Sequence, residues 1–466
     1  MECATMSLPR TPYPSLLTLA ILSTVMLSMP VINVDSSNHA AITDTNGLSI
    51  ILMIGDGMGL EHVKLGRWVE VGPDGNLTMD TLPYNWSVTT HSADAAITDS
   101  AASATAIATG VKTKNGMVGQ SPDGSDLTTI LEIAEVIGKS SGLISTTIYN
   151  HATPAGFYAN ISSRYDYAAI TNQLVYDKDV DIVLSGGVFD STQLAEMESR
   201  GYTIVDNRTE LNAVSSGKVL GIFGNDSMPY EAARDFNTIP SLAEMTNKSI
   251  EILSQDPDGF FLMVEGGLID WSGHDNDEVG VALETIAFDK AINVSLQYVQ
   301  EHSNTILLVT ADHETGGLTV ISNTLSQELP SDSNIESDNR ILRVERANNI
   351  TTTWTGSSHT ATQVPLFMFG GALSAFPEIN NIDNTDIFVI MDTYFSGGTL
   401  NTGIFETTAT TTPTTTTTAA PEMSSSTTEP ASTPLPLPQP MDGIIILLAI
   451  GAAAVVIVAL ILSKKT

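Results

Sequence analysis

Short apolar runs alternate with longer helical patterns between residues 48 and 405, and this alternation limits the possible folds of the chain more than any other feature. The candidate strands are 49–54, 143–149, 182–184, 260–264, 306–310 and 365–369. Helical stretches between them include 127–137, 242–253 and 281–302. Buried strands that alternate with helices indicate a sheet covered on both faces. The sequence therefore predicts an α/β fold with a mostly parallel central sheet.

Both ends of the chain carry patterns typical of exported, membrane-attached proteins. Arg10 precedes an apolar run, so residues 1–35 are predicted to be a cleavable secretory signal, with an uncleaved anchor as the alternative. Residues 443–462 carry no charge and are long enough for a transmembrane helix, with a buried core helix as the alternative. Lys464 and Lys465 follow, which predicts a cytoplasmic C-terminus. Residues 407–440 are rich in Thr, Pro, Ser and Ala and are predicted to form a disordered stalk.

These patterns predict a cell-surface protein whose catalytic domain, residues 40–406, lies outside the membrane. The only cysteine is Cys3, within the predicted signal, so no disulfide is expected in the mature chain. Asn-x-Ser/Thr triplets fit an exported glycoprotein, and they begin at Asn76, Asn85, Asn160, Asn207, Asn225, Asn247, Asn293 and Asn349. The formal charge of −34 argues against nucleic acid as a partner.

Residues with metal-binding or nucleophilic chemistry follow four of the candidate strands. They are Asp56, His151, Thr153, Glu265, Asp270, His274, Asp312 and His313. Each has an ordinary structural explanation on its own, such as a turn or a helix cap. The carboxyl ends of parallel strands meet at one edge of a sheet, however, and clustered carboxylates there would repel one another. Bound metal ions would remove that conflict.

The segment from Thr98 to Ala106 adds a candidate nucleophile. Asp99 is a suitable N-cap for the alanine-rich stretch that follows, and Ser100 would lie in the first helical turn. The free amides and the dipole of that turn favour an anion. A nearby metal could stabilise the Ser100 alkoxide, although an ordinary capped helix would explain the same residues.

Taken together, these residues resemble the motifs of the alkaline phosphatase family, in family order and over residues 48–371. The motifs are Ile54-Gly55-Asp56-Gly57-Met58-Gly59, Thr98-Asp99-Ser100-Ala101-Ala102-Ser103, Ala152-Thr153-Pro154-Ala155, Val264-Glu265-Gly266, Thr310-Ala311-Asp312-His313 and His359. The resemblance implies a three-layer α/β sandwich and hydrolysis of small phosphate monoesters. It also implies a homodimer, which no other feature of the sequence predicts.

The same resemblance implies a role for each residue of the site. Ser100 would be the nucleophile that becomes a phosphoserine, and Arg164 would hold the phosphate oxygens. The implied ligands are Asp270, His274 and His359 for a first zinc ion, Asp56, Asp312 and His313 for a second, and Asp56, Thr153 and Glu265 for magnesium.

Two positions differ among family members. His151 and Trp271 stand where some members have aspartate and lysine, which bears on the third metal and on phosphate contact. Packing at the rim of the pocket is the alternative role for both side chains. The short segment between His313 and His359 predicts a small crown above the sheet. The remaining histidines, His39, His62, His91 and His302, are expected to be structural or exposed.

Two other functions compete with this prediction. A phosphodiesterase, nucleotide pyrophosphatase or sulfatase of the same superfamily would share the metal ligands but differ around the nucleophile. A surface glycoprotein with an inherited, inactive phosphatase domain would fit the stalk and the triplets, but not a complete set of ligands and nucleophile.

Overall fold

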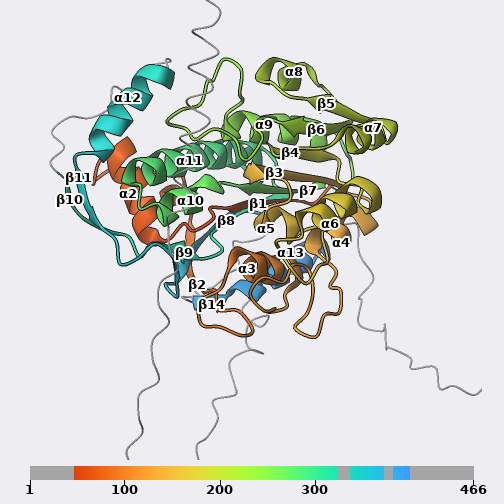
Figure 1. Ribbon diagram of the computed structural model, residues 1–466, viewed down its shortest axis with the longest axis horizontal. Helices are drawn as coiled ribbons and strands as arrows, with labels where there is room; N and C mark the ends of the chain where they lie inside the picture. The colour runs from red at the N-terminus through yellow and green to blue at the C-terminus, as the bar shows by residue number, and fades with distance from the viewer. Residues whose placement is uncertain (1–46, 324–335, 372–380, 399–466) are drawn as a thin grey trace, which may run out of the picture. The chain divides into compact units, whose positions relative to one another are not determined.

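The computed structural model of the protein describes residues 47–323, 336–371 and 381–398 (Figure 1). The predicted signal (1–35), stalk (407–440) and transmembrane segment (443–462) lie outside the described residues. Among the residues that are described, no helix combines the length and the apolar character needed to cross a membrane.

A ten-stranded mixed sheet forms the centre of the fold, in the order β14-β2-β13-β8-β1-β7-β3-β4-β6-β5. The strands are β1 (Ser49–Ile54), β2 (Tyr84–Thr89), β3 (Ser140–Ile148), β4 (Ile182–Gly186), β5 (Tyr202–Val205), β6 (Lys218–Ile222), β7 (Phe260–Glu265), β8 (Thr305–Thr310), β13 (Val364–Gly370) and β14 (Asn381–Asp383). All pairings are parallel except those of β13 with β2 and β8. The predicted α/β class with a mostly parallel sheet is confirmed.

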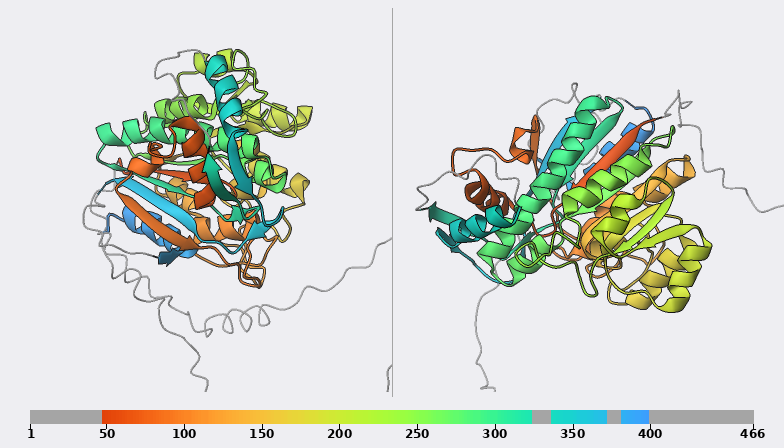
Figure 2. Two further views of the ribbon diagram at one scale, coloured as in Figure 1. Left: turned by 90° about the vertical axis from the view of Figure 1, so that its left-hand side faces the viewer. Right: turned by 90° about the horizontal axis from the view of Figure 1, so that it is seen from above.

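Helices cover both faces of the sheet (Figures 1 and 2). One face carries α2 (Leu60–Glu70), α9 (Leu242–Leu253), α10 (Leu268–His274) and α11 (Glu278–Glu301). The other carries α3 (Ser100–Thr109), α4 (Ile130–Val136), α5 (Ala152–Ala155) and α13 (Asn384–Phe395). The central strands β1, β7 and β8 are buried along their whole length, as their uninterrupted apolar runs predict.

Capping residues explain where the predicted helices begin. The helix predicted at 242–253 is α9, and Ser241 and Glu244 form a capping box at its start. The helix predicted at 127–137 begins instead at Ile130, because Thr129 and Glu132 form the capping box there. The long helix predicted from residue 281 begins three residues earlier, after the N-cap Asp277.

Strand β13 differs from the expectation of parallel strands, since it runs antiparallel to β8 with Leu366 opposite Thr310. The chain leaves β8 at the carboxyl edge of the sheet and reaches His359 before it enters β13 from that edge. The connection therefore sets the direction of β13, and an apolar run carries no information about direction. Strands β2, β5, β6 and β14 were not predicted, because they are short or only partly buried.

A small substructure stands between β8 and β13, where a crown was expected. Its described elements are β9 (Glu314–Thr315), β10 (Thr319–Asn323), α12 (Glu336–Ala347), β11 (Ile350–Thr353) and β12 (His359–Thr360). Strand β10 pairs with β11, and β12 pairs with β9. The second pairing returns His359 to the residues that follow β8. The remaining helical elements are η1 (Met79–Thr81), α6 (Tyr167–Asn172), η2 (Gln173–Asp177), α7 (Ser191–Ser199) and α8 (Arg208–Ala213).

Candidate active site

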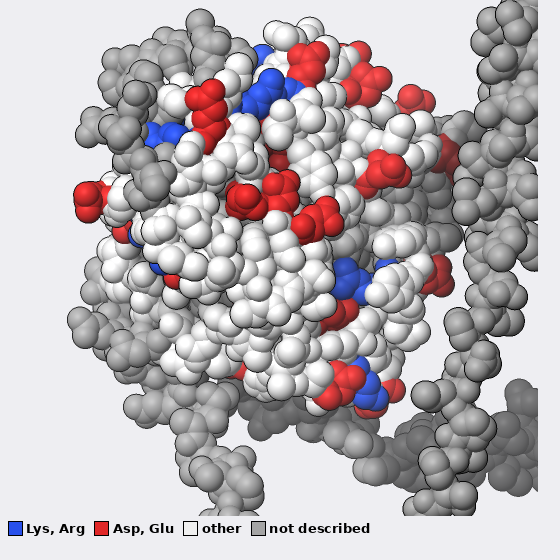
Figure 3. All heavy atoms as spheres, turned by 60° about the vertical axis from the view of Figure 1, so that its left-hand side comes forward, with Lys and Arg blue, Asp and Glu red and all other residues white. Residues whose placement is uncertain are grey.

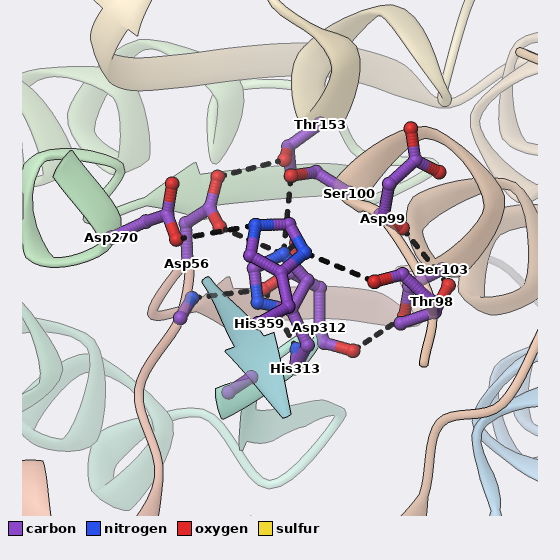
Figure 4. Close-up of polar contacts among 12 residues, drawn as sticks. Asp56, Thr98, Asp99, Ser100, Ser103, Thr153, Asp270, Asp312, His313 and His359 are labelled. Atoms are coloured by element: carbon purple, nitrogen blue, oxygen red, sulfur yellow. Dashed lines mark hydrogen bonds and ion pairs between the residues drawn. The ribbon is translucent and has the colours of Figure 1, made fainter. Parts of the chain in front are cut away.

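Four neighbouring strands, β8, β1, β7 and β3, deliver polar side chains to one edge of the sheet. Asp56 follows β1, Glu265 ends β7, and Asp312 and His313 follow β8. Thr153 lies in α5, directly after β3. Figure 4 shows the side chains of Asp56, Thr153, Asp312 and His313 together around one centre. The carboxyl edge of the parallel strands is therefore the candidate site, as expected for an α/β sheet.

Ser100 is the first residue of α3, and its side chain is directed toward this centre. Asp99 caps the helix by accepting a hydrogen bond from the backbone N–H of Ala102, at 3.0 Å. The Ser100 hydroxyl is buried and lies 3.2 Å from Nε2 of His313. The N-terminal end of α3 favours negative charge at that hydroxyl.

One cluster joins α10 to the crown through Asp270, His274 and His359. The Nε2 atoms of His274 and His359 lie 3.1 Å apart, and each lies within 3.7 Å of an Asp270 carboxylate oxygen. Their Nδ1 atoms point to the backbone carbonyls of Ser357 (2.7 Å) and Thr98 (3.0 Å). Donation of Nδ1–H to those carbonyls leaves both Nε2 lone pairs facing one another, which suits two ligands of one cation.

A second cluster, of Asp56, Asp312 and His313, is fully buried. Nε2 of His313 lies 3.5 Å from Asp56 Oδ1 and 3.3 Å from Asp312 Oδ2. Burial raises the pKa of both carboxyls, that of Asp312 to about 7, and lowers the pKa of His313. Asp312 Oδ1 accepts hydrogen bonds from the backbone N–H groups of Gly57 and His313, whereas Oδ2 has no hydrogen-bond partner.

A third cluster joins Asp56 to His151 and Glu265. Oε2 of Glu265 accepts hydrogen bonds from the hydroxyls of Ser145 and Thr147, while Oε1 has no hydrogen-bond partner. The Thr153 hydroxyl lies 3.4 Å from Asp56 Oδ2. His151 thus stands among the candidate ligands as well as beside Trp271, whose ring meets the His151 ring edge-on at 6.1 Å.

These clusters fit bound cations. Three buried carboxylate oxygens, one each on Asp56, Glu265 and Asp312, have no hydrogen-bond partner. Burying a carboxylate without a partner is costly, and burial accordingly raises the pKa of all three groups. Divalent ions would supply the missing partners. The second and third clusters share Asp56, and His313 of the second cluster also lies close enough to Asp270 and His359 to form a metal set with them.

Arg164 is the one arginine of the sequence-predicted set, and it pairs with the residue before Ser100. Its guanidinium pairs with Asp99 Oδ2 at 3.0 Å and lies 3.3 Å from His151 Nε2. Asp99 Oδ2 also accepts the backbone N–H of Gly116, whose carbonyl accepts the backbone N–H of Arg164. The loop at Gly116 therefore fixes Arg164 relative to the start of α3. Acidic side chains outnumber basic ones on the face drawn in Figure 3, so an anion site depends on such local charge.

Thr315 was not singled out from the sequence, although it lies two residues after His313. Its hydroxyl donates to Asp270 Oδ1 at 2.5 Å and lies 3.2 Å from Nδ1 of His313. A proton on that Nδ1 leaves Nε2 free to face Asp56 and Asp312. A hydroxyl within the Asp-His run was the available signal, but its contact with Asp270 depends on the position of α10.

A buried chain of hydrogen bonds from α13 was also not predicted. The Ser103 hydroxyl donates to the backbone carbonyl of Asp312 at 2.7 Å and accepts from the Asn384 amide at 2.9 Å. Lys112 donates to the Asn384 carbonyl oxygen at 2.6 Å. Ser103 and Asn384 are fully buried, so these hydrogen bonds tie α13 to the backbone of Asp312, a candidate ligand.

The histidines outside the clusters have structural positions where they are described. His62 is fully buried and meets the Trp354 ring edge-on, and burial lowers its pKa to about 4. His302 stacks on Tyr298 at the end of α11. His91 is exposed and lies 3.5 Å from Asp383. His39 lies outside the described residues.

An α/β sheet with a buried serine and three overlapping cation sets at its carboxyl edge is the arrangement of a metal-binding hydrolase. The alkaline phosphatase family model matches residues 48–341, and the chain belongs to that family.

Individual relatives agree with this assignment. Alkaline phosphatase 3 of Bacillus subtilis is 37% identical over 287 residues, which cover 58% of this chain and 62% of that protein. The chain therefore spans a little under two thirds of the length of that relative. The cold-active alkaline phosphatase of Shewanella sp. is 31% identical, with a TM-score of 0.64 over 74% of this chain and 100% of the solved one.

A third relative contains a bound metal ion. It is a variant of the alkaline phosphatase from the Antarctic bacterium TAB5, in which a histidine is replaced by aspartate and magnesium is bound in the M3 site. It is 27% identical to this chain, with a TM-score of 0.63 over 76% of this chain and 99% of the solved one.

Proposed function

We propose that the protein is an alkaline phosphatase that hydrolyses small phosphate monoesters through a phosphoserine at Ser100. The observation that carries this proposal is the Ser100 hydroxyl at the start of α3, 3.2 Å from His313 and among the buried carboxylates. Membership of the family and the activity named for its relatives support it.

The proposed cofactors are two zinc ions and one magnesium ion. Asp270, His274 and His359 would hold the first zinc ion, and Asp56, Asp312 and His313 the second. Asp56, Thr153 and Glu265 would hold magnesium. Imidazole and carboxylate suit zinc, whereas hydroxyl and carboxylate oxygens suit magnesium. When bound, the ions supply Lewis-acid stabilisation of the attacking and leaving oxygens.

The residues of the chain bind and orient the substrate for two displacements. Arg164, which pairs with Asp99, would donate two hydrogen bonds to phosphate oxygens. Ser100 Oγ loses its proton to water and forms a bond to phosphorus, while the bond to the ester oxygen breaks and the alcohol leaves with a proton. Water then attacks phosphorus and gives up a proton, the bond to Ser100 Oγ breaks, Oγ takes up a proton from water, and inorganic phosphate is released. Proton transfer by a side chain is not required at either step.

Replacing Ser100 tests this proposal most directly. The Ser100→Ala variant is expected to lose phosphoenzyme formation and several orders of magnitude in kcat/KM, because the attacking oxygen is absent. Its metal content and melting temperature should stay near those of the wild type. The assay uses p-nitrophenyl phosphate, labelled phosphate and metal analysis. Labelled phosphate trapped on the variant would refute the nucleophile, and faster turnover of the bis-ester by the wild type would favour a phosphodiesterase.

We further propose that the enzyme acts at the cell surface. The support is the sequence alone: a secretory signal at 1–35, a stalk at 407–440 and an uncharged segment at 443–462. An extended stalk of this length would reach about 100 Å, at roughly 3.1 Å per residue. Protease added to intact cells should release active enzyme. No release by a protease that cuts the purified stalk would contradict the proposal. Homodimerisation stays a prediction from the family resemblance.

A further inference from the structure

Three large apolar side chains are exposed close to the Asp99–Arg164 pair. Ile97 is 43% exposed, Tyr165 73% and Tyr167 40%. Only eleven large apolar side chains are exposed among the described residues, and three of them lie within three residues of Asp99 or Arg164. Apolar side chains left in water next to a functional group are a common mark of a binding surface.

Hydrogen bonds tie the segments that carry Ile97 and Tyr165 to the turn at Asn115 and Gly116. The Asn115 side chain donates to the Ile97 carbonyl at 3.0 Å and accepts the backbone N–H of Asp99 at 3.1 Å. The next residue, Gly116, accepts the backbone N–H of Arg164 at 2.7 Å. The segments that carry the two exposed side chains are therefore tied to the same turn as Asp99 and Arg164.

The Tyr165 ring adjoins the guanidinium itself, with its centroid 5.9 Å from Cζ of Arg164. The guanidinium also contacts Asp99 and His151. A phosphate oxygen on Arg164 would lie about 3 Å from its nitrogen atoms. The group esterified to that phosphate would then come close to the exposed ring of Tyr165.

We infer that Tyr165, with Ile97 tied to the same turn, forms a subsite for the leaving group that favours phosphate monoesters of aromatic alcohols. This inference rests on the proposed phosphatase activity. An aromatic leaving group would stack on the exposed face of Tyr165, and both rings would lose contact with water. A small alkyl group covers too little of the ring to gain the same stabilisation.

Benzyl phosphate and ethyl phosphate test the subsite, because their alcohols have similar acidity and differ chiefly in the ring. The ratio of kcat/KM for benzyl over ethyl phosphate therefore reports binding of the ring. Tyr165→Ala is expected to lower that ratio by about 3- to 10-fold. Tyr165→Phe keeps the ring and should keep the ratio. Tyr176→Ala, which removes another exposed tyrosine from η2, is the matched control and should leave the ratio unchanged.

Inhibition by inorganic phosphate separates a subsite from an indirect effect on Arg164. Phosphate has no leaving group, so its inhibition constant should be the same in Tyr165→Ala and the wild type. If phosphate inhibits Tyr165→Ala more weakly, by a factor that accounts for the whole loss in kcat/KM for benzyl phosphate, the subsite is overturned. An unchanged ratio of kcat/KM values in Tyr165→Ala would overturn it as well. Failure of the wild-type enzyme to turn over either ester would instead refute the proposed function, and with it the subsite.

Discussion

Among the single residues of the site, His151 contacts both the proposed phosphate-binding arginine and a candidate metal set. One ring nitrogen lies 3.3 Å from Arg164, and the ring shares a candidate metal set with Asp56 and Glu265. Burial lowers the pKa of His151 to about 3, so the imidazole is neutral at working pH. A neutral nitrogen donor is a poor partner for a hard ion such as Mg²⁺, so the third set is expected to bind magnesium weakly.

Replacing this imidazole should alter the magnesium response. His151→Asp adds a carboxylate to the third set and is expected to lower the Mg²⁺ concentration for half-maximal activation by about tenfold. Adding Trp271→Lys should strengthen inhibition by inorganic phosphate, because it places a positive charge near the bound anion. Both variants are titrated with Mg²⁺ and assayed with phosphate. Unchanged magnesium and phosphate responses would mean that both residues only pack the rim.

Glu284 in α11 provides a pH test away from the metal sites. Burial, followed by repulsion from Glu231, raises its pKa to about 8, and its Oε1 accepts the Glu231 backbone N–H at 2.6 Å. Between the ordinary pKa near 4.5 and this value, the folded state keeps a proton that the unfolded state has released. Folding is therefore linked to proton binding in that window, and this carboxyl lowers stability as pH rises through it.

Glu284→Gln should remove this loss of stability. The amide cannot ionise but keeps an oxygen for the Glu231 N–H. The variant is expected to match the wild type at pH 5 and to exceed it at pH 9, by up to about 4 kcal/mol in the free energy of unfolding. Denaturant unfolding at both pH values measures the difference. Glu301→Gln, at the exposed end of the same helix, is the control. An equal difference at both pH values would contradict the prediction.

At the scale of elements, the site depends on how helices are joined to strand ends. Helix α3 carries Ser100 at its first turn and Ser103 one turn later, and Ser103 is bonded to the backbone of Asp312. The nucleophile and the second cluster are therefore held in register by one hydroxyl. Asn384 in α13 completes the hydrogen bonding of that hydroxyl.

Asn384→Ala should loosen this junction. It leaves the buried Ser103 oxygen without its donor, at a cost of about 1–3 kcal/mol in stability. Retention of the cation at Asp312 and His313 should weaken by about tenfold. Chelator competition and thermal melting measure the two effects. Thr385→Ala removes only a capping contact with Asp383 in the same helix, and should lower stability without changing cation retention. Equal loss of cation in both variants would show a general effect of α13.

The whole molecule combines a formal charge of −34 with a centre of buried carboxylates. Removing the proposed cations would leave Asp56, Glu265 and Asp312 to repel one another without hydrogen-bond partners for all of their oxygens. Their raised pKa values mean that the folded, metal-free protein holds protons that the unfolded chain releases. These three carboxyls are thus expected to lower the stability of the metal-free protein as pH rises, at least up to the pKa of Asp312 near 7.

Chelation should therefore lower the melting temperature more at pH 8 than at pH 5.5. Competition between protons and metal for the same ligands acts in the same direction. Calorimetry with and without chelator at the two pH values measures the gap, and added Zn²⁺ should restore the melting temperature and activity. A gap that is the same at both pH values would argue against carboxylate repulsion as its cause.

Local sequence patterns were sufficient for the strands that position the site. Both faces of β1, β7 and β8 are buried, so these strands are apolar without interruption. Such a run can be recognised directly in the sequence. The polar residues after each run followed from the same pattern, because a parallel sheet gathers its carboxyl ends at one edge. The helix beginning at Ser100 was predictable from its N-cap and its alanine-rich composition.

Only the tertiary structure decided which of these side chains meet. Asp56 and Asp312 are separated by more than 250 residues, yet both lie within 3.5 Å of one His313 nitrogen. The contact of Thr315 with Asp270 and that of Asn384 with Ser103 likewise depend on how α10 and α13 pack. Periodicity and capping depend on residues that are close in the sequence, so they can be predicted from it. The ligand sets, the direction of β13 and the place of His151 depend on distances across the folded sheet, which no local pattern encodes.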